Sequence, residues 1–398
     1  MPQRVRYCRH CGTEHTPAPL NAACEQLNRR GAQVSRRRVL QELGIGVLAL
    51  TGAITLESCT SQNHYLPAIH VIPIATPGAD YIYRGHSAAV TTVAWSPDGR
   101  YIASGSADKT VQVWQAANGA LRYTFTGHTS PVTTLAWNAQ STSITSAGDE
   151  DGKVWVWKAL QGEQEANHTG QHGKVLSLAW PDPNATATPV NVILSGAEDG
   201  TAQVWDAANG KTAGTNTEHG GIRAILSSSP DRALLAGDDN IIHYWKIFSD
   251  GSTAATPATY EGHTGAINAL TWIEDTYNNF ASASDDGTVR VWSTTSARSS
   301  ASPTLTYRGH TGSVYAVAAY KGLVISGGQD KSTQIWQANT GKLLYAYTGH
   351  QGAIRSLAVV PPLLSAFSKH TPVPFVASAS DDETVHVWRI PEQALASA

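Results

Sequence analysis

The chain has 398 residues, of which 41% are hydrophobic and 15% are charged, and its formal net charge at pH 7 is −3. This length and apolar content allow one large domain, or two to three ordinary ones, with a sizeable core. The charge is uneven, since residues 1–62 carry a net +4 and residues 63–398 a net −7. Lysine and arginine are scattered over the second part rather than clustered, which argues against nucleic acid as a partner.

All four cysteines fall within the first 59 residues, so the rest of the chain cannot form a disulfide in any compartment. Cys8 and Cys11 form a C-x-x-C pair, and Cys24 follows. This spacing resembles half of a zinc ribbon, but tetrahedral zinc needs four ligands, and Leu27 stands where the fourth cysteine would be. Two alternatives stay open, a small zinc knuckle completed by a nearby histidine or a set of free thiols. No other cofactor is expected.

The segment from residue 35 to residue 59 has the layout of an export signal. Three arginines precede a mostly apolar run of about fourteen residues, which is short for a spanning helix but suits a signal peptide. Ser35–Leu40 resembles a twin-arginine signal, and Leu56–Cys59 resembles a lipobox, in which the cysteine becomes lipidated. Glu57 is unusual in such a box. Three alternatives remain, namely cleavage at Cys59 to give an exported lipoprotein, an uncleaved membrane anchor, or a buried apolar helix.

We therefore divide the chain into a signal or anchor segment with a cysteine-rich head at 1–62, a linker at 63–78 and a folded domain at 79–398. Both membrane alternatives keep the arginines in the cytoplasm, so the folded domain is expected to face the outside of the membrane. Cleavage at Cys59 would also remove the cysteine cluster that precedes it.

Seven copies of one unit make up the folded domain. A G-H-x-x-x-V/I motif begins at Gly85, Gly127, Gly262, Gly309 and Gly349, and two shortened variants begin at Gln171 and Glu218. The seven histidines of these motifs are 40 to 47 residues apart. A tryptophan ends each unit. The residue six positions before it is Asp in all seven units, and the residue ten positions before it is Ser in five.

Each unit is predicted to form four short strands. In the first unit these are Thr91–Trp95, Tyr101–Gly105, Thr110–Trp114 and Leu121–Phe125, separated by turn-forming residues. Four strands in about 43 residues make one blade of a propeller. The last unit ends after its third strand, and residues 79–84 supply the missing fourth strand from the other end of the folded domain. This closure removes an exposed sheet edge.

The GH motif, the closing tryptophan and the period resemble the WD40 repeat family over residues 79–398, although only Trp205-Asp206 is a literal WD pair. The resemblance implies an all-β, seven-bladed β-propeller with a buried, hydrogen-bonded His, Ser, Asp and Trp tetrad in each blade. A buried histidine needs a partner, so these residues are expected to be structural rather than catalytic. With Ser146 displaced by one position, the members are His86, Ser104, Asp108 and Trp114; His128, Asp151 and Trp157; His172, Ser195, Asp199 and Trp205; His219, Asp239 and Trp245; His263, Ser282, Asp286 and Trp292; His310, Ser326, Asp330 and Trp336; and His350, Ser378, Asp382 and Trp388.

WD40 propellers mostly bind partners on their top face. The resemblance therefore implies a non-catalytic protein-interaction scaffold that uses this face. We expect the protein to be a monomer. The residue before each tetrad Asp should point outward on this face, and it is acidic in five units, as Glu150, Glu198, Asp238, Asp285 and Asp381. The residue after each V/I position should line the channel mouth, where Arg223, Asn268, Tyr315 and Arg355 are predicted to contact a partner. We expect a basic protein or peptide there. The alternative is that the acidic residues only favour tight turns and solubility.

Two other classes of function stay open. The first is a cell-surface sensor that binds a small ligand or a polymer. The second is an enzyme with a site in the central channel, which would need convergent ionisable groups outside the tetrads. Residues 63–398 contain no nucleophile motif, phosphate-binding loop or paired-cysteine metal site, which disfavours the enzyme.

Overall fold

The computed structural model describes residues 78–148, 152–182, 191–217, 220–247, 259–273, 278–294, 300–360 and 374–397. The cysteine-rich head and the signal-like segment lie outside these ranges, so zinc binding at Cys8, Cys11 and Cys24 and lipidation of Cys59 stay predictions. Among the described residues, no helix has the length and apolar character needed to cross a membrane.

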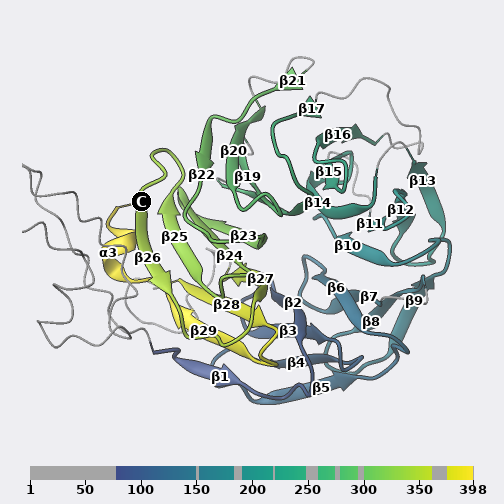
Figure 1. Cartoon of the computed structure of the whole chain (residues 1–398). Helices are drawn as coiled ribbons and strands as arrows, with labels where there is room; N and C mark the ends of the chain where they lie inside the picture. The colour runs from purple at the N-terminus through teal and green to yellow at the C-terminus, as the bar shows by residue number, and fades with distance from the viewer. Residues whose placement is uncertain are drawn as a thin grey trace, which may run out of the picture. The chain divides into compact units, whose positions relative to one another are not determined.

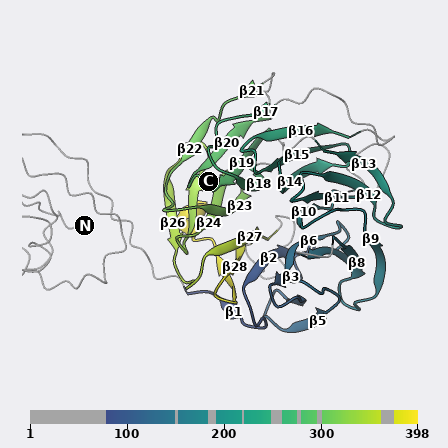
Figure 2. The same cartoon turned by 45° about the vertical axis from the view of Figure 1, so that its right-hand side comes forward.

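Seven sheets stand around a common centre as the blades of a propeller, which confirms the predicted fold (Figures 1 and 2). The innermost strands are β2 (Val90–Trp95), β6 (Val132–Trp137), β10 (Val175–Ala179), β14 (Ile222–Ser229), β18 (Ile267–Trp272), β23 (Val314–Tyr320) and β27 (Ile354–Val359). The second strands are β3 (Tyr101–Ser106), β7 (Ser143–Gly148), β11 (Val192–Ala197), β15 (Arg232–Gly237), β19 (Asn279–Ser284), β24 (Leu323–Gly328) and β28 (Phe375–Ser380). Strand order in each sheet follows chain order for these positions.

The outer half of each blade holds the shorter strands. The third strands are β4 (Val111–Gln115), β8 (Val154–Lys158), β12 (Ala202–Asp206), β16 (Ile242–Lys246), β20 (Val289–Ser293), β25 (Thr333–Gln337) and β29 (Val385–Arg389). The outermost strands are β5 (Leu121–Phe125), β9 (Gln164–His168), β13 (Thr212–Asn216), β17 (Thr259–Tyr260), β22 (Leu305–Tyr307), β26 (Leu343–Tyr347) and β1 (Tyr81–Tyr83). Blade 4 gains a fifth strand, β21 (Ser300–Ala301), which pairs with β17 in parallel.

Blade 7 closes the ring from both ends of the described domain. Its first three strands are β27, β28 and β29, and its outermost strand is β1, as predicted. Strand β1 pairs antiparallel with β29 over three residues, from Tyr81 opposite Val387 to Tyr83 opposite Val385. The residue before β1, Asp80, adds an ion pair of 2.9 Å with Arg389 of β29.

The core is a set of apolar layers between blades rather than one central cluster. Each of seven buried clusters combines side chains of two neighbouring blades. At most junctions an aromatic residue at the end of an outermost strand stacks on the closing tryptophan of the next blade. The ring centroids are 4.4 Å apart for Tyr83 and Trp114 and 4.8 Å apart for Tyr347 and Trp388, with nearly parallel planes. Every blade therefore depends on its neighbour for burial of its largest side chain.

A short C-terminal helix, α3 (Glu392–Leu395), follows the last strand and was not predicted from the sequence. Ile390 and Ala394 are buried in the apolar layer between blades 6 and 7. The segment after β29 therefore adds packing to the closing blade.

We predict that deletion of residues 79–84 abolishes the cooperative thermal transition of the propeller. The deletion exposes the edge of β29 and removes Tyr83 from its stack on Trp114, so the ring loses its closure. Circular dichroism melting measures the effect. Ile82→Ala is the matched control, because Ile82 lies in the same strand with a partly exposed side chain and should change stability by less than about 0.5 kcal/mol. A deletion variant with the parent melting temperature would contradict the role of β1.

Candidate functional site at the top face

The top face consists of the loops that enter the innermost strands and the turns between the second and third strands. A buried hydrogen-bond network lies beneath it in blade 1. His86 Nδ1 is 2.8 Å from Asp108 Oδ2, and His86 Nε2 is 2.8 Å from Ser104 Oγ. The Trp114 indole donates to the same serine oxygen at 3.3 Å, and the Ser87 amide donates to Asp108. The network fastens the loop to the neighbouring turn.

The same network recurs in blades 5, 6 and 7, as predicted from the spacing. The His Nδ1 to Asp Oδ2 distances are 2.8, 2.9 and 2.8 Å for His263–Asp286, His310–Asp330 and His350–Asp382. Ser282, Ser326 and Ser378 lie 2.7, 2.8 and 2.8 Å from the other imidazole nitrogen, and each accepts the indole N–H of Trp292, Trp336 or Trp388. In blade 2 the displaced Ser146 takes the serine role with His128 and Trp157, while Asp151 lies outside the described residues.

Arg223, on blade 4, lies at the inner ring, which we define as the seven positions directly after the V/I residue of each motif. Its Nε donates to Asp238 Oδ1 at 2.6 Å. Its Nη1 reaches blade 5, where it donates to Asn268 Oδ1 at 3.1 Å and lies 3.6 Å from Asp285. Asn268 in turn donates to Asp285 at 2.8 Å. Four of the residues predicted to bind a partner therefore form one cluster across the junction between blades 4 and 5.

Arg355 of blade 7 makes a second charged contact on the inner ring. Its guanidinium donates two hydrogen bonds to Asp381, of 2.8 and 2.7 Å, and lies 4.5 Å from the centroid of the Tyr315 ring in blade 6. The hydrogen bond to Asp381 raises the pKa of Arg355, against the opposing effect of burial. At the same position in blades 1 and 2, Thr91 and Thr133 donate to a backbone carbonyl of the next blade. Inner-ring side chains therefore tie neighbouring blades together.

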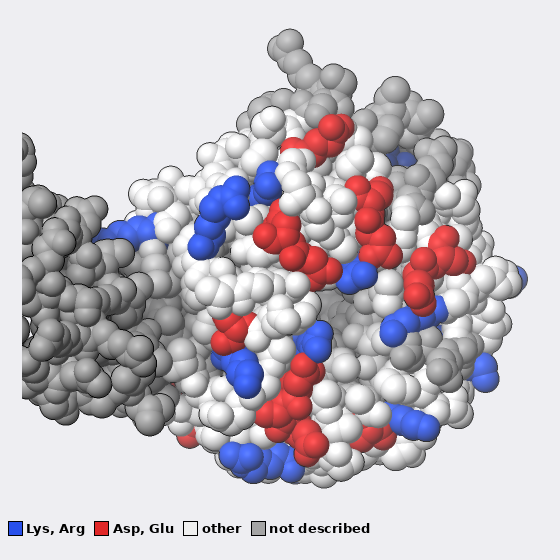
Figure 3. Space-filling view, viewed as in Figure 1, with Lys and Arg blue, Asp and Glu red and all other residues white. Residues whose placement is uncertain are grey.

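The acidic turn residues differ in how far they reach into solvent. Glu198 and Asp238 are exposed, Asp285 and Asp381 are half-buried, and Glu150 lies outside the described residues. Figure 3 shows acidic side chains grouped around the hollow at the centre of the ring, with basic side chains beside them. The charge at this mouth is therefore mixed, with arginines placed between carboxylates.

Comparison with known families decides the identity of the repeat. The family model for the WD domain, G-beta repeat, matches residues 80–115, 119–158, 162–206, 255–293, 301–337 and 341–389, which together are more than half of the chain. The chain belongs to the WD40 repeat family. The unmatched stretch between residues 206 and 255 carries most of blade 4, the copy whose sequence is weakest.

Similarity to individual curated proteins is confined to short stretches in the matches considered. Protein Mut11 of Chlamydomonas reinhardtii is 49% identical over 55 residues, which are 12% of this chain and 15% of that protein. WD repeat-containing protein pop2 of Schizosaccharomyces pombe is 29% identical over 84 residues, 20% of this chain and 12% of that protein. A ribosome biogenesis protein BOP1 homolog of Drosophila virilis is 53% identical over 38 residues, 10% and 5% of the two chains. The matched stretches of this chain thus cover at most 15% of the length of these relatives.

The prediction that His172 is the tetrad histidine of blade 3 is wrong. His172 is exposed, and the buried Gln171 takes its place. Gln171 precedes the V/I position by four residues, as the histidine does in the intact WD40 repeats, whereas His172 precedes it by three. Ser195 donates to Gln171 Oε1 at 2.6 Å, and Gln171 Nε2 donates to Thr201 Oγ1 at 2.8 Å. Thr201 donates to Asp199, so the amide and the threonine together replace the imidazole link.

Blade 4 also departs from the repeat. Leu235 stands where the tetrad serine would be, and Asp239 contacts His243 of β16 at 2.7 Å, while the predicted His219 lies outside the described residues. The indole nitrogen of Trp245 is buried without a hydrogen-bond partner among the described residues, and the same holds for Trp205 in blade 3. An unpaired buried donor costs about 1–3 kcal/mol, so the closing tryptophans of blades 3 and 4 lack a stabilising hydrogen bond that those of the other five blades make to a serine.

The tetrads have the Ser, His and Asp order of a nucleophilic triad but cannot act as one. The serine of blade 1, Ser104, is completely buried, and its oxygen already accepts the indole N–H of Trp114. A triad needs its serine oxygen exposed to a substrate carbonyl. These groups therefore stabilise the blades and offer no reaction site.

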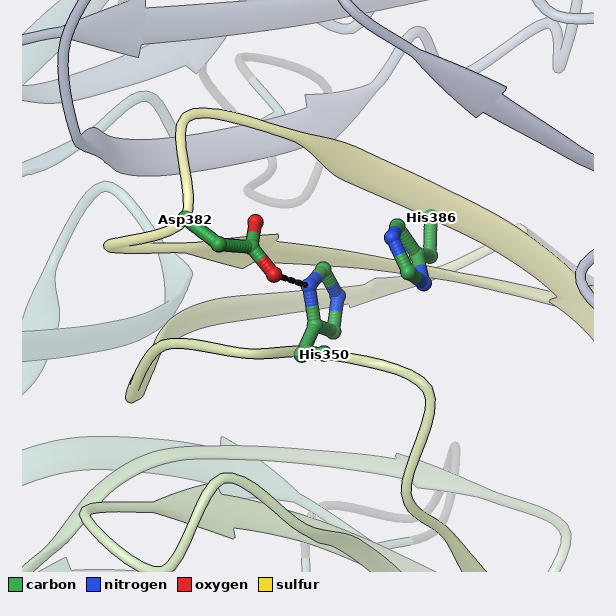
Figure 4. Close-up of side chains that lie close together, drawn as sticks. All are labelled: His350, Asp382 and His386. Atoms are coloured by element: carbon green, nitrogen blue, oxygen red, sulfur yellow. Dashed lines mark hydrogen bonds and ion pairs between the residues drawn. The ribbon is translucent and has the colours of Figure 1, made fainter.

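One cluster in blade 7 has the residue types of a metal site. Ligand atoms of His350, Asp382 and His386 lie within 4.8 Å of one another (Figure 4). His350 is already hydrogen-bonded to Asp382 and Ser378, and His386 Nδ1 is hydrogen-bonded to the Tyr347 hydroxyl at 2.6 Å. The two imidazole rings are stacked, with centroids 3.7 Å apart and planes at 23°. Imidazole lone pairs lie in the ring plane, so stacked rings cannot direct them at one ion.

We predict that Asp330→Asn lowers stability at neutral pH and flattens the loss of stability in acid. Burial alone would raise the pKa of Asp330, but the hydrogen bond and charge of His310 and two backbone amides lower it to about 2. A carboxyl whose pKa is lower in the folded state stabilises above its unfolded pKa of 3.8, here by about 2 kcal/mol, and this contribution is lost as the pH falls towards 2. Urea unfolding between pH 7 and pH 2 measures it. Glu165→Gln, on the exposed side of β9, controls for the loss of a charge. Equal pH slopes for the parent and Asp330→Asn would contradict the role of the pair.

Proposed function

We propose that this WD40 propeller is a non-catalytic protein-interaction scaffold that receives a basic segment of its partner on the top face. The proposal rests on the acidic residues that precede the tetrad aspartates. These side chains vary while the turn beneath them stays the same, which points to a role outside the fold.

The backbone of the turn does not require an acidic residue. The amide of Ala107 in blade 1 donates to the carbonyl of Ala89 at 2.9 Å, and the amide of Gln329 in blade 6 makes the same bond at 2.9 Å. The amides of Asp285 and Asp381 make equivalent bonds at 2.9 and 3.0 Å. Alanine, glutamine and aspartate thus build one turn, so turn geometry does not explain why most blades carry an acid here.

The charge balance of this face supports a basic partner. Arg223 and Arg355 are each paired with carboxylates, so neither arginine presents an unpaired positive charge. Glu198 is exposed and has no ion-pair partner among the described residues. The pairing of both arginines also weakens the alternative of an enzyme that holds an anion at the channel mouth. Complementary charge raises the association rate and selects partners more than it raises affinity.

We predict that a lysine-rich peptide binds the propeller in a salt-dependent way and that Glu198→Gln together with Asp381→Asn weakens this binding at least several-fold. Titration calorimetry at low and at physiological salt measures the binding constant. A peptide with glutamate in place of lysine serves as the ligand control. The matched variant is Glu163→Gln, because Glu163 is an exposed acid in the turn before β9, away from the top face. Equal loss in both variants, or binding without salt dependence, would contradict the proposal.

We further propose that residues 35–59 hold the propeller at the outer side of a membrane. The three arginines, the apolar run and Cys59 support this location, and the domain without cysteines is compatible with an oxidising compartment.

The intact mass and the N-terminal peptide of the protein recovered from its own membranes test this location. We expect a chain that begins at lipid-modified Cys59 and lacks the upstream cysteine cluster. A chain that keeps Met1 or Pro2 would refute cleavage, and its absence from the membrane fraction would refute tethering.

A further inference from the structure

His386 lies on β29, in the blade that closes the ring. Its backbone pairs with Ile82 of the terminal strand β1 on one side and with Ser378 of β28 on the other. Its side chain is 4% exposed and faces blade 6, where its Nδ1 lies 2.6 Å from the Tyr347 hydroxyl oxygen. One residue therefore contacts the terminal strand through its backbone and the neighbouring blade through its ring.

Blades 1 and 6 show what a glutamine at this position does. Gln112 in blade 1 and Gln334 in blade 6 stand two residues before their closing tryptophans, as His386 does. The Tyr83 hydroxyl donates to Gln112 Oε1 at 2.5 Å, and the Tyr307 hydroxyl donates to Gln334 Oε1 at 2.6 Å. We assign Tyr347 the same donor role towards His386 Nδ1, because the two residues occupy the equivalent positions. A glutamine oxygen accepts this proton at any pH, whereas an imidazole nitrogen accepts it only while it is unprotonated.

We propose that His386 makes the closing blade acid-sensitive, so that its protonation loosens β29 from blade 6 and from β1 and opens the ring where its two ends meet. Between β1 and β29 the closure is thin, since the two strands share three residue pairs, one further backbone hydrogen bond from Asp80 and one exposed ion pair. A change in β29 therefore acts at the junction that holds the two ends of the described domain together.

The surroundings of His386 oppose a positive charge. Burial disfavours it most, and the His350 ring stacked against it and the guanidinium of Arg84 add to the effect. Asp382 would favour the charge, but it already accepts hydrogen bonds from His350, the Gln351 amide and Thr384. Tyr347 completes the set, and its own pKa is raised by burial, so it stays a neutral donor.

Linkage gives the sign and the size of the effect. These contacts lower the pKa of His386 from 6.5 to about 4. The unfolded chain therefore binds a proton that the folded blade excludes, and stability falls as the pH drops from 6.5 towards 4. At pH 5 the unfolding constant is expected to be about 30-fold larger than above pH 7.5 from this residue alone. The tetrad carboxyls lose their contribution at lower pH, below 3.8, so the two effects occupy different windows.

Two substitutions test the proposal. His386→Gln restores the residue of blades 1 and 6, so it should keep the hydrogen bond of Tyr347 and fold normally. Between pH 7.5 and pH 5, the unfolding constant of the parent should rise by a factor about 30 times larger than that of His386→Gln. Gln334→His, made in the parent, should add a comparable acid sensitivity in blade 6. Chemical denaturation across this pH range measures both variants.

Hydrogen exchange then locates the opening. After correction for the intrinsic pH dependence of exchange, protection of β1 and β29 should fall between pH 7 and pH 5 in the parent and stay constant in His386→Gln. Protection of β7 and β8 serves as the internal control. The proposal is overturned if His386→Gln keeps the parent pH slope, or if acid lowers protection equally in all blades. Should His386→Gln fail to fold at pH 7.5, an unchanged pH slope in Gln334→His would overturn it as well.

Discussion

The structure depends on one recurring contact, the aromatic ring at the end of an outermost strand that stacks on the closing tryptophan of the next blade. The tryptophan is the largest side chain of each repeat, and it is buried together with residues of the preceding blade. Phe125 does this for Trp157, and Tyr307 for Trp336, with nearly parallel rings. The sequence repeat thus begins with the last strand of one blade and ends within the next. This offset joins all blades into a ring and leaves a strand to be supplied from the other end of the folded domain.

The seven copies keep the buried contacts of the repeat unevenly, and blades 3 and 4 depart from them most. In blade 3 a glutamine and a threonine carry the link that histidine makes elsewhere, and in blade 4 a leucine removes the serine altogether. The outermost strand of blade 3 ends at Asn216, which has no ring to place on Trp245. Arg223 reaches from blade 4 to Asn268 and Asp285 of blade 5 at the next junction. A polar contact on the inner ring thus adds to a sector whose buried network is incomplete.

Most of the fold could be predicted from the sequence because periodic residues determine it. The strands of the first repeat lie within one residue of their predicted bounds, and the closing role of residues 79–84 followed from a count of strands. The prediction for blade 3 was wrong because it followed the residue type, histidine, rather than the distance to the V/I residue. Gln171 has the spacing of the tetrad histidines, and His172 does not. Helix α3 could not be predicted, because it is one turn long and depends on the space beside blades 6 and 7. The pairing of Arg223 and Arg355 with acids could not be predicted either, since their partners lie 15 and 26 residues away, in the turns after the second strands.

The distribution of ionisable groups explains why a binding role fits this propeller better than a catalytic one. In blades 1, 5, 6 and 7 the histidines and aspartates of the tetrads are hydrogen-bonded to one another beneath the surface. Catalysis needs ionisable groups that converge on an accessible point with their bonding capacity free. The positions that differ from blade to blade, at the inner ring and before each tetrad aspartate, carry instead paired or solvated charges. Under the proposed function, a rigid scaffold that repeats its interior and varies its rim would distinguish partners by the pattern of charge on that rim.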